Sequence, residues 1–200
     1  MKKVQLVCLS LAIAGMVSCK DDKKDKEDAS TEMEVEKTEM VTEDENKSMP
    51  TKTVTLMLEP KSDSEASGKV AFREDNGAVT MNARILGLTP GTHAIHIHET
   101  ADCSSPDGKS SGGHWNPTFE DHGKWGDAEG FHRGDIGNFE ANEQGEGMVT
   151  ITTDLWCIGC NDEKKDILGK AIIVHQGVDD FTSQPSGDAG ARVSCGGIIQ

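Results

Sequence analysis

Two histidines separated by one residue, His96 and His98, constrain the fold of this chain more than any other feature. Side chains on a β-strand alternate between its faces, so a strand over 94–98 turns both imidazoles to one side. Ile95 and Ile97 then point to the opposite side, as expected of a strand that borders a core. The pattern predicts a strand with one apolar face and one metal-binding face.

Most of the other histidines extend this pattern into two ligand groups. A closed set of three imidazoles and one carboxylate, typical of tetrahedral zinc, comprises His114, His122, His132 and Asp135. The nitrogens of His96, His98 and His175 suit copper, and His114, if shared, would supply a fourth. His93 falls on the core-facing side of the predicted strand, so we interpret it as a structural histidine.

Longer stretches around these residues match a known family. They are His-Ile-His-Glu at 96–99, Gly-Gly-His-Trp-Asn-Pro at 112–117, Asp-His-Gly at 121–123, His-Arg-Gly-Asp-Ile-Gly-Asn at 132–138, Val-His-Gln-Gly-Val-Asp-Asp at 174–180 and Gly-Asp-Ala-Gly-Ala-Arg-Val-Ser-Cys-Gly at 187–196. In this order they resemble the copper/zinc superoxide dismutases, in particular the exported lipoprotein type of bacteria. The resemblance covers roughly residues 51–200.

The resemblance implies a role for each matching residue. The implied copper ligands are His96, His98, His114 and His175, and the implied zinc ligands are His114, His122, His132 and Asp135. It further implies that Asp179 hydrogen-bonds one copper and one zinc histidine, here His96 and His122, that Arg192 orients the substrate, and that Cys103 pairs with Cys195. The implied reaction is dismutation of superoxide to oxygen and hydrogen peroxide, with His114 taking up a proton when its bond to copper breaks.

Short alternating segments predict an all-β domain. They lie at 54–58, 69–72, 79–85, 94–98, 148–152 and 171–174, with glycine-containing turns between them. The resemblance implies an eight-stranded Greek-key barrel, flattened and sandwich-like as described for this family. Two long loops are expected to carry function: 99–135 with the zinc ligands, and 176–194 at the substrate entrance.

The N-terminal quarter of the chain is expected to target and tether the domain. Residues 1–18 have the charged start and apolar stretch of a signal peptide, and Met16-Val17-Ser18-Cys19 resembles a lipoprotein signal in which Cys19 is lipidated. Residues 20–50 contain 6 Lys and 12 Asp or Glu and predict a disordered acidic linker. The sequence thus predicts a lipid-anchored protein of the cell envelope, facing the periplasm or the cell surface, with its folded domain at 51–200.

The cysteines are consistent with an oxidising compartment. Once Cys8 leaves with the signal peptide and Cys19 is lipidated, four cysteines remain in the domain, which allows three pairings. The pair Cys157 and Cys160 departs from the common family pattern. We expect a local disulfide there; unpaired thiols and a metal or redox site are the alternatives.

The net charge of −15 is unfavourable for an anionic substrate, so the local field of Arg192 and the metals would have to attract it. Lys124, Lys164 and Lys165 are candidates for assisting, or are surface charges. No nucleic-acid partner is expected. The sequence leaves the oligomeric state open, with a homodimer as one option, because its three tryptophans can serve as interface anchors or as core residues: Trp115, Trp125 and Trp156.

Two other functions remain open at this point. The domain could store or deliver copper, or it could be a structural lipoprotein that metal and disulfide merely stabilise. An arginine beside an open copper position argues against the first, and the set His96, His98 and His175 argues against the second. Turnover of copper-loaded and metal-free protein separates all three.

Overall fold

The computed structural model describes residues 50–200. The predicted signal peptide, the lipidated Cys19 and nearly all of the acidic linker lie outside these residues, so they remain predictions. Within 50–200, no helix combines the length and apolar character needed to cross a membrane.

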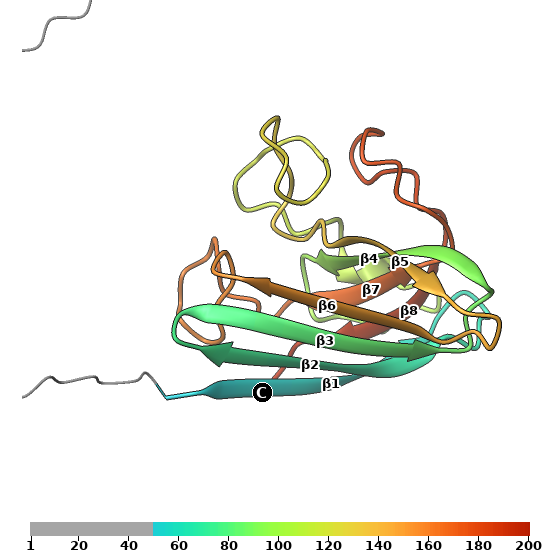
Figure 1. The fold of residues 1–200 in the computed structure, drawn as a ribbon, viewed down its shortest axis with the longest axis horizontal. Coiled ribbons are helices and arrows are strands. Elements are labelled where there is room, and N and C mark those ends of the chain that lie inside the picture. Colours follow the sequence, from blue (N-terminus) through green and yellow to red (C-terminus); the bar gives the residue numbers. More distant parts are fainter. Residues whose placement is uncertain (1–49) are drawn as a thin grey trace, which may run out of the picture. The chain divides into compact units, whose positions relative to one another are not determined.

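Eight antiparallel strands close into a barrel (Figure 1). They are β1 (Lys52–Pro60), β2 (Ser67–Asp75), β3 (Ala78–Leu86), β4 (Gly91–His98), β5 (Gly137–Ala141), β6 (Gly147–Thr153), β7 (Ala171–His175) and β8 (Arg192–Gly197). The order around the barrel is β1-β2-β3-β6-β5-β4-β7-β8, in which β3–β6, β4–β7 and β1–β8 join strands distant in sequence. This confirms the predicted all-β, eight-stranded Greek-key barrel.

Each of the six alternating segments lies within a strand, but alternation alone missed β5 and β8. β5 alternates in burial, but Phe139 is its only large apolar side chain, and β8 is buried along most of its length, so neither shows a clear hydrophobic period of two in the sequence. The predicted entrance loop at 176–194 is also corrected, because its last three residues belong to β8. They join the sheet because Arg192 pairs with His175 and Ser194 with Val174.

The core fills the inside of the barrel and explains why β4 has two functions. β1 and β3 alternate between buried and exposed residues, whereas the last six residues of β4 and all of β7 are buried on both faces. Ile95 and Ile97 point into the core as predicted. The opposite face of β4 is covered by the long connections 99–136 and 176–191, which rise together above β4, β5 and β7 in Figure 1.

Two disulfides are present in residues 50–200: one fastens the 99–136 connection to the barrel, and the other lies within the β6–β7 connection. Cys103 in the first connection is bonded to Cys195 in β8, 92 residues away in sequence. Ala171, Ile173 and Cys195 form a small second apolar cluster with Cys103, on the outer face of β7 and β8. Cys157 and Cys160 form the expected local disulfide in the connection between β6 and β7.

Candidate metal centre

Three histidines meet on the outer face of β4 and β7. His96 and His98 lie opposite Ile173 and Ala171 in the β4–β7 pairing, and His175 ends β7. A register shift between Val174 and His175 marks a bulge, a feature that re-aims side chains beside functional sites. The imidazole of His175 lies 4.9 Å from that of His96 and 5.6 Å from that of His98, centroid to centroid.

His114 reaches this cluster from the first long connection. It forms an isolated β-bridge with His98, and its ring centroid lies 4.0 Å from that of His96. On its other side, its ring lies within 6 Å of two further imidazoles, those of His122 and His132. His114 is therefore the residue shared between two groups of four potential ligands.

The first group presents four nitrogens without partners. Hydrogen bonds hold the other ring nitrogen of three of these imidazoles: His98 Nδ1 to Gly112 O at 3.0 Å, His175 Nδ1 to Gly190 O at 3.3 Å, and His96 Nε2 to Asp179. Four buried nitrogens are left without a hydrogen bond: His96 Nδ1, His98 Nε2, His114 Nε2 and His175 Nε2. Burying a polar atom without a partner costs free energy. Four such nitrogens close to one another therefore indicate a binding site for a metal ion.

The second group closes around the carboxylate of Asp135. Asp135 Oδ1 lies 2.8 Å from His114 Nδ1 and 3.1 Å from His132 Nδ1, and Oδ2 lies 3.0 Å from His122 Nδ1. The contacts of His122 and His132 have ion-pair distances without hydrogen-bond geometry, so both Nδ1 atoms count as unpartnered. All four donors are buried and aim at a common point, which suits tetrahedral zinc.

Asp179 connects the two groups by bonding the ring nitrogens that face away from the ligand sites. Its Oδ2 accepts a hydrogen bond from His96 Nε2 at 2.8 Å, and its Oδ1 accepts one from His122 Nε2 at 2.9 Å. These bonds fix the tautomers that leave Nδ1 of both rings free for metal. Asn138 of β5 holds Asp179 in turn, with one hydrogen bond to its N–H and one to its carbonyl.

Burial sets the protonation of the first group in the metal-free protein. Desolvation, with the neighbouring histidines, lowers the pKa of His98 and His175 well below 6.5, so both rings are neutral at pH 7. Burial also lowers the pKa of His114, to about 4, despite its bond to Asp135. Neutral imidazole is the form that binds metal.

The second group is electrostatically different. Burial lowers the pKa of His122, but the carboxylates of Asp135 and Asp179 have the larger combined effect and raise it to about 9. The histidines likewise outweigh burial at Asp135 and Asp179 and hold the pKa of both carboxyls below the usual range. A metal cation at the centre of the group would replace the proton as the partner of the Asp135 carboxylate.

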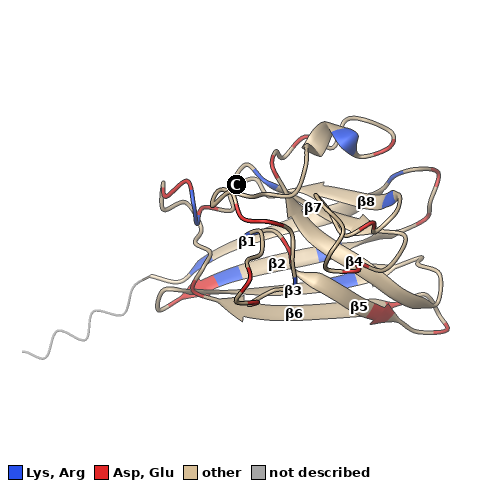
Figure 2. Cartoon of the chain, turned by 90° about the horizontal axis from the view of Figure 1, so that it is seen from above, with Lys and Arg blue, Asp and Glu red and all other residues tan. Residues whose placement is uncertain are grey.

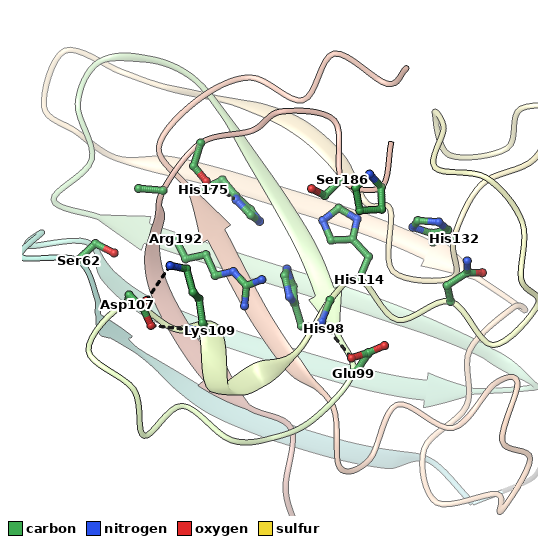
Figure 3. A pocket seen from close by; sticks show the side chains of 15 residues that line it. Ser62, His98, Glu99, Asp107, Lys109, His114, His132, His175, Ser186 and Arg192 are labelled. Carbon is green, nitrogen blue, oxygen red and sulfur yellow. Dashed lines mark hydrogen bonds and ion pairs between the residues drawn. The ribbon is translucent and has the colours of Figure 1, made fainter. Parts of the chain in front are cut away.

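Arg192 lines a cavity of about 590 Å³ that opens onto the first group. In Figure 3 its side chain lies between His175 and His98. Arg192 Nη1 donates to Gly108 O at 2.9 Å and to Ser111 Oγ at 3.2 Å, so the Cys103–Ser111 segment holds the guanidinium. Burial lowers the pKa of Arg192, but an arginine remains charged at neutral pH.

The cavity also contains charges that our sequence reasoning missed. Lys109, Asp107 and Glu99 line it beside Arg192, and Lys109 Nζ lies 3.1 Å from Asp107 Oδ2 (Figure 3). Lys109 lies in the loop that starts at Cys103, and this proximity to the implied disulfide was the only signal in the sequence. Of the lysines proposed from sequence, none lines this cavity, and Lys164 lines a different one.

Other predicted residues fall outside the metal groups. His93 is buried beside Phe139 and contacts the carbonyls of His175 and Thr89 through its two nitrogens, as a structural histidine does. Trp115 and Trp156 belong to the core and Trp125 packs against it. Lysines, arginines and acidic residues are interspersed over strands and loops in Figure 2, so the fold does not gather one sign of charge on one side.

Comparison with known proteins agrees with this geometry. Residues 66–198 match the family model "Copper/zinc superoxide dismutase (SODC)". The chain belongs to the copper/zinc superoxide dismutase family. The prediction of a dismutase with copper and zinc is therefore confirmed at the level of the family.

Individual relatives are similar over most of their length. "Superoxide dismutase [Cu-Zn] 2" of Aquifex aeolicus is 36% identical over 67% of this chain and 80% of its own. The protein of that name from Mesembryanthemum crystallinum is 39% identical over 64% and 84%. Among solved structures, a double mutant of a SOD-like protein from Bacillus subtilis superposes with a TM-score of 0.65, at 30% identity, over 73% of this chain and 97% of that one.

Proposed function

We propose that this protein dismutates superoxide at a copper ion held by the first histidine group, outside the cytoplasm. The observation that carries the proposal is the set of four unpartnered imidazole nitrogens beside a cavity that contains Arg192. His98, His114 and His175 of the first group all line this cavity, which also reaches His132 of the second group. A small anion can therefore reach the first group.

The two groups suit different metals. His96, His98, His114 and His175 offer four nitrogens, a donor set that copper accepts readily. The second group adds the Asp135 carboxylate to three nitrogens, is buried and suits zinc. His114 belongs to both groups and would help to hold both metals.

Arg192 supplies the substrate-binding charge. Copper, when bound, provides the one-electron couple that oxidises one superoxide to oxygen and reduces the next to hydrogen peroxide. The guanidinium, fixed by Gly108 O and Ser111 Oγ, is placed to attract the anion and hold it beside His98 and His175. A positive charge in a narrow cavity raises the local concentration of an anionic substrate even on an acidic protein.

His114 is suited to deliver a proton to the product. Its Nε2 lies at the cavity without a hydrogen-bond partner. A proton taken up there could pass to peroxide in the cavity, which fits a reaction that must protonate peroxide at each turnover. In the metal-free protein, a hydrogen bond from Nδ1 to Asp135 orients the ring.

The test is metal content together with turnover of the purified protein. We expect about one copper and one zinc per chain, and rapid superoxide dismutation that disappears in metal-free protein and returns when copper is added. Copper binding without turnover would instead support a storage or delivery function. A protein that binds only zinc would overturn the copper assignment.

We place this activity in the cell envelope, on a lipid anchor at Cys19. Support comes from the signal-like residues 1–18 and from two disulfides in the domain, which persist in oxidising compartments. Two acyl chains and an amide-linked one would hold the protein stably at a membrane. The variant Cys19→Ser should leave the membrane fraction and keep its dismutase activity; a variant that stays in the membrane fraction would contradict the anchor.

A further inference from the structure

The zinc ligands His132 and Asp135 lie in a part of the β4–β5 connection that is neither helix nor strand, so contacts from other segments must fix their backbone. One side is held by β4, where Ile97 N donates to Gly134 O at 2.9 Å. Gly134 N in turn donates to the carbonyl of Trp115, in the same connection, at 3.0 Å. The other side is held by a residue of the β6–β7 connection. Trp156 Nε1 donates a hydrogen bond of 2.9 Å to the carbonyl of Arg133, the first of the two residues between the ligands.

Trp156 is well suited to be a fixed support. Its side chain is only 1% exposed and packs edge-on against Phe72 of β2, with ring centroids 6.3 Å apart. The ring of Trp156 also packs against that of Trp125, with centroids 5.2 Å apart. The ring of Trp125 lies 5.1 Å, centroid to centroid, from that of Phe131, which is the residue before His132. The indole therefore supports the ligand segment twice, through a hydrogen bond and through an aromatic chain.

The turn that follows holds Trp156 in place. The Cys157–Cys160 disulfide closes it, and Asp166 accepts hydrogen bonds from Gly159 N at 2.9 Å and Asn161 N at 3.0 Å. Ile158 inside the turn is fully buried. Its N–H and carbonyl bond to Glu74 and Lys52, which form an ion pair on β1 and β2 at 3.6 Å. The turn is thus fastened to the barrel wall through both backbone polar groups of Ile158.

We propose that Trp156 is a positioning residue for the zinc ligands His132 and Asp135, and that the Cys157–Cys160 turn holds it in register. Groups that orient metal ligands from behind commonly change metal affinity by about 10- to 100-fold. The proposal rests on zinc occupying the closed group. It assigns a function to the Cys-x-x-Cys segment, which the copper chemistry does not use.

The test compares zinc release from the full-length, metal-loaded protein and its variants in the presence of a chromogenic chelator. Trp156→Phe keeps an aromatic ring but removes the N–H donor, and should release zinc about tenfold faster while keeping its copper. With Co²⁺ in the zinc site, its visible absorption bands should change, because they report ligand geometry. The double variant Cys157→Ser with Cys160→Ser should also release zinc faster, with Cys103–Cys195 intact.

Ile85→Val in β3 is the matched control, because it destabilises the core away from Trp156. It should release zinc at the wild-type rate. Equal rates for Trp156→Phe and wild type, or equally fast release by the Ile85→Val control, would overturn the proposal. Absence of zinc from the wild-type protein would instead refute the metal assignment on which the proposal rests.

A measurement on the wild-type protein decides the question if Trp156→Phe does not fold. Coupling between two sites is reciprocal, so an indole that stabilises the zinc site must itself be stabilised by zinc. Hydrogen exchange of the Trp156 indole N–H should slow by about tenfold when zinc is added to the metal-free protein. An exchange rate that zinc leaves unchanged would overturn the proposal.

Discussion

At the scale of single residues, the centre depends on side chains whose second polar atom is already bonded. His98, His175 and His96 each use one nitrogen for a structural hydrogen bond and leave the other for metal. Arg192 likewise uses Nη1 to hold its place and presents the rest of its guanidinium to the cavity. Function at this scale therefore depends on orientation, and small changes in the supporting groups should be measurable.

Replacing Arg192 by Ala should leave both metals bound and slow dismutation by about 10- to 100-fold, equivalent to roughly 1.4 to 2.7 kcal/mol of barrier. The reason is loss of the fixed charge that orients the anion. The wild-type rate should fall as salt rises, and the variant should depend on salt less. Stopped-flow assays over a range of ionic strength check both effects, and Arg192→Lys is the control that keeps the charge. An unchanged rate and salt response would place the substrate elsewhere.

Replacing Gly187 by Ala should weaken metal binding by about 10- to 100-fold. Gly187 has φ +67, and a Cβ there would collide with Asp179 Oδ1 and would approach His122 Nε2 to 2.7 Å, so it would separate that hydrogen-bonded pair. Gly169→Ala is the control, because Gly169 has a similar φ of +79 but no atom within 4 Å of an added Cβ. Competition with a chelator measures the affinities. Equal losses in both variants would attribute the effect to backbone strain alone.

At the scale of elements, the two metal groups differ in what carries them. His96, His98 and His175 lie on the paired strands β4 and β7, whereas His122, His132 and Asp135 lie in the connection before β5. Paired strands keep their geometry without metal, while a long connection depends on its ligands and on a few anchoring contacts. Loss of zinc and loss of copper should therefore have different structural consequences.

His122→Ala or Asp135→Ala should lower zinc occupancy and speed hydrogen exchange in residues 113–136, with little change in β4 and β7. His175→Ala should chiefly remove copper and activity, and leave exchange in 113–136 as in the wild type. Metal analysis and hydrogen exchange with peptide resolution check this. The same pattern in all three variants would refute the division into two sites.

At the scale of the whole molecule, the metal-free protein buries a cluster of titratable groups whose pKa values shift in opposite directions. The pKa of His122 is raised to about 9, while the pKa values of His98, His114 and His175 are lowered. A raised pKa adds stability that is lost as pH rises toward 9. Lowered histidine pKa values cost stability as pH falls below about 6.5, because the unfolded chain then binds more protons.

The metal-free protein should consequently be most stable between about pH 6 and 7, and its melting temperature should fall on both sides of this range. The loaded protein should show a flatter profile over the same range, because bound metal replaces protons on these nitrogens. Thermal unfolding from pH 5 to 9, with and without metals, checks this. A metal-free protein whose stability rises steadily from pH 6.5 to 9 would contradict the raised pKa of His122.

The spacing of the ligands was readable from the sequence because each motif is local. His-x-His fixes one face of a strand, and alternating segments identify six of the eight strands. β5 and β8 were not identified, since β5 has a single large apolar side chain, Phe139, and β8 is buried along most of its length and combines Arg192 with two glycines, so neither has a clear hydrophobic pattern. The disulfide between Cys157 and Cys160 could be expected because only two residues separate them.

Only the tertiary structure decided which groups meet across long separations. The bulge that turns His175 toward β4, the placement of Lys109 and Asp107 beside Arg192, and the bond from Trp156 to the Arg133 carbonyl join residues from different connections. No local pattern encodes such contacts, because they depend on how loops of irregular shape pack over the closed barrel. The sequence determined the chemistry of the ligands, and the fold determined their orientation and supports.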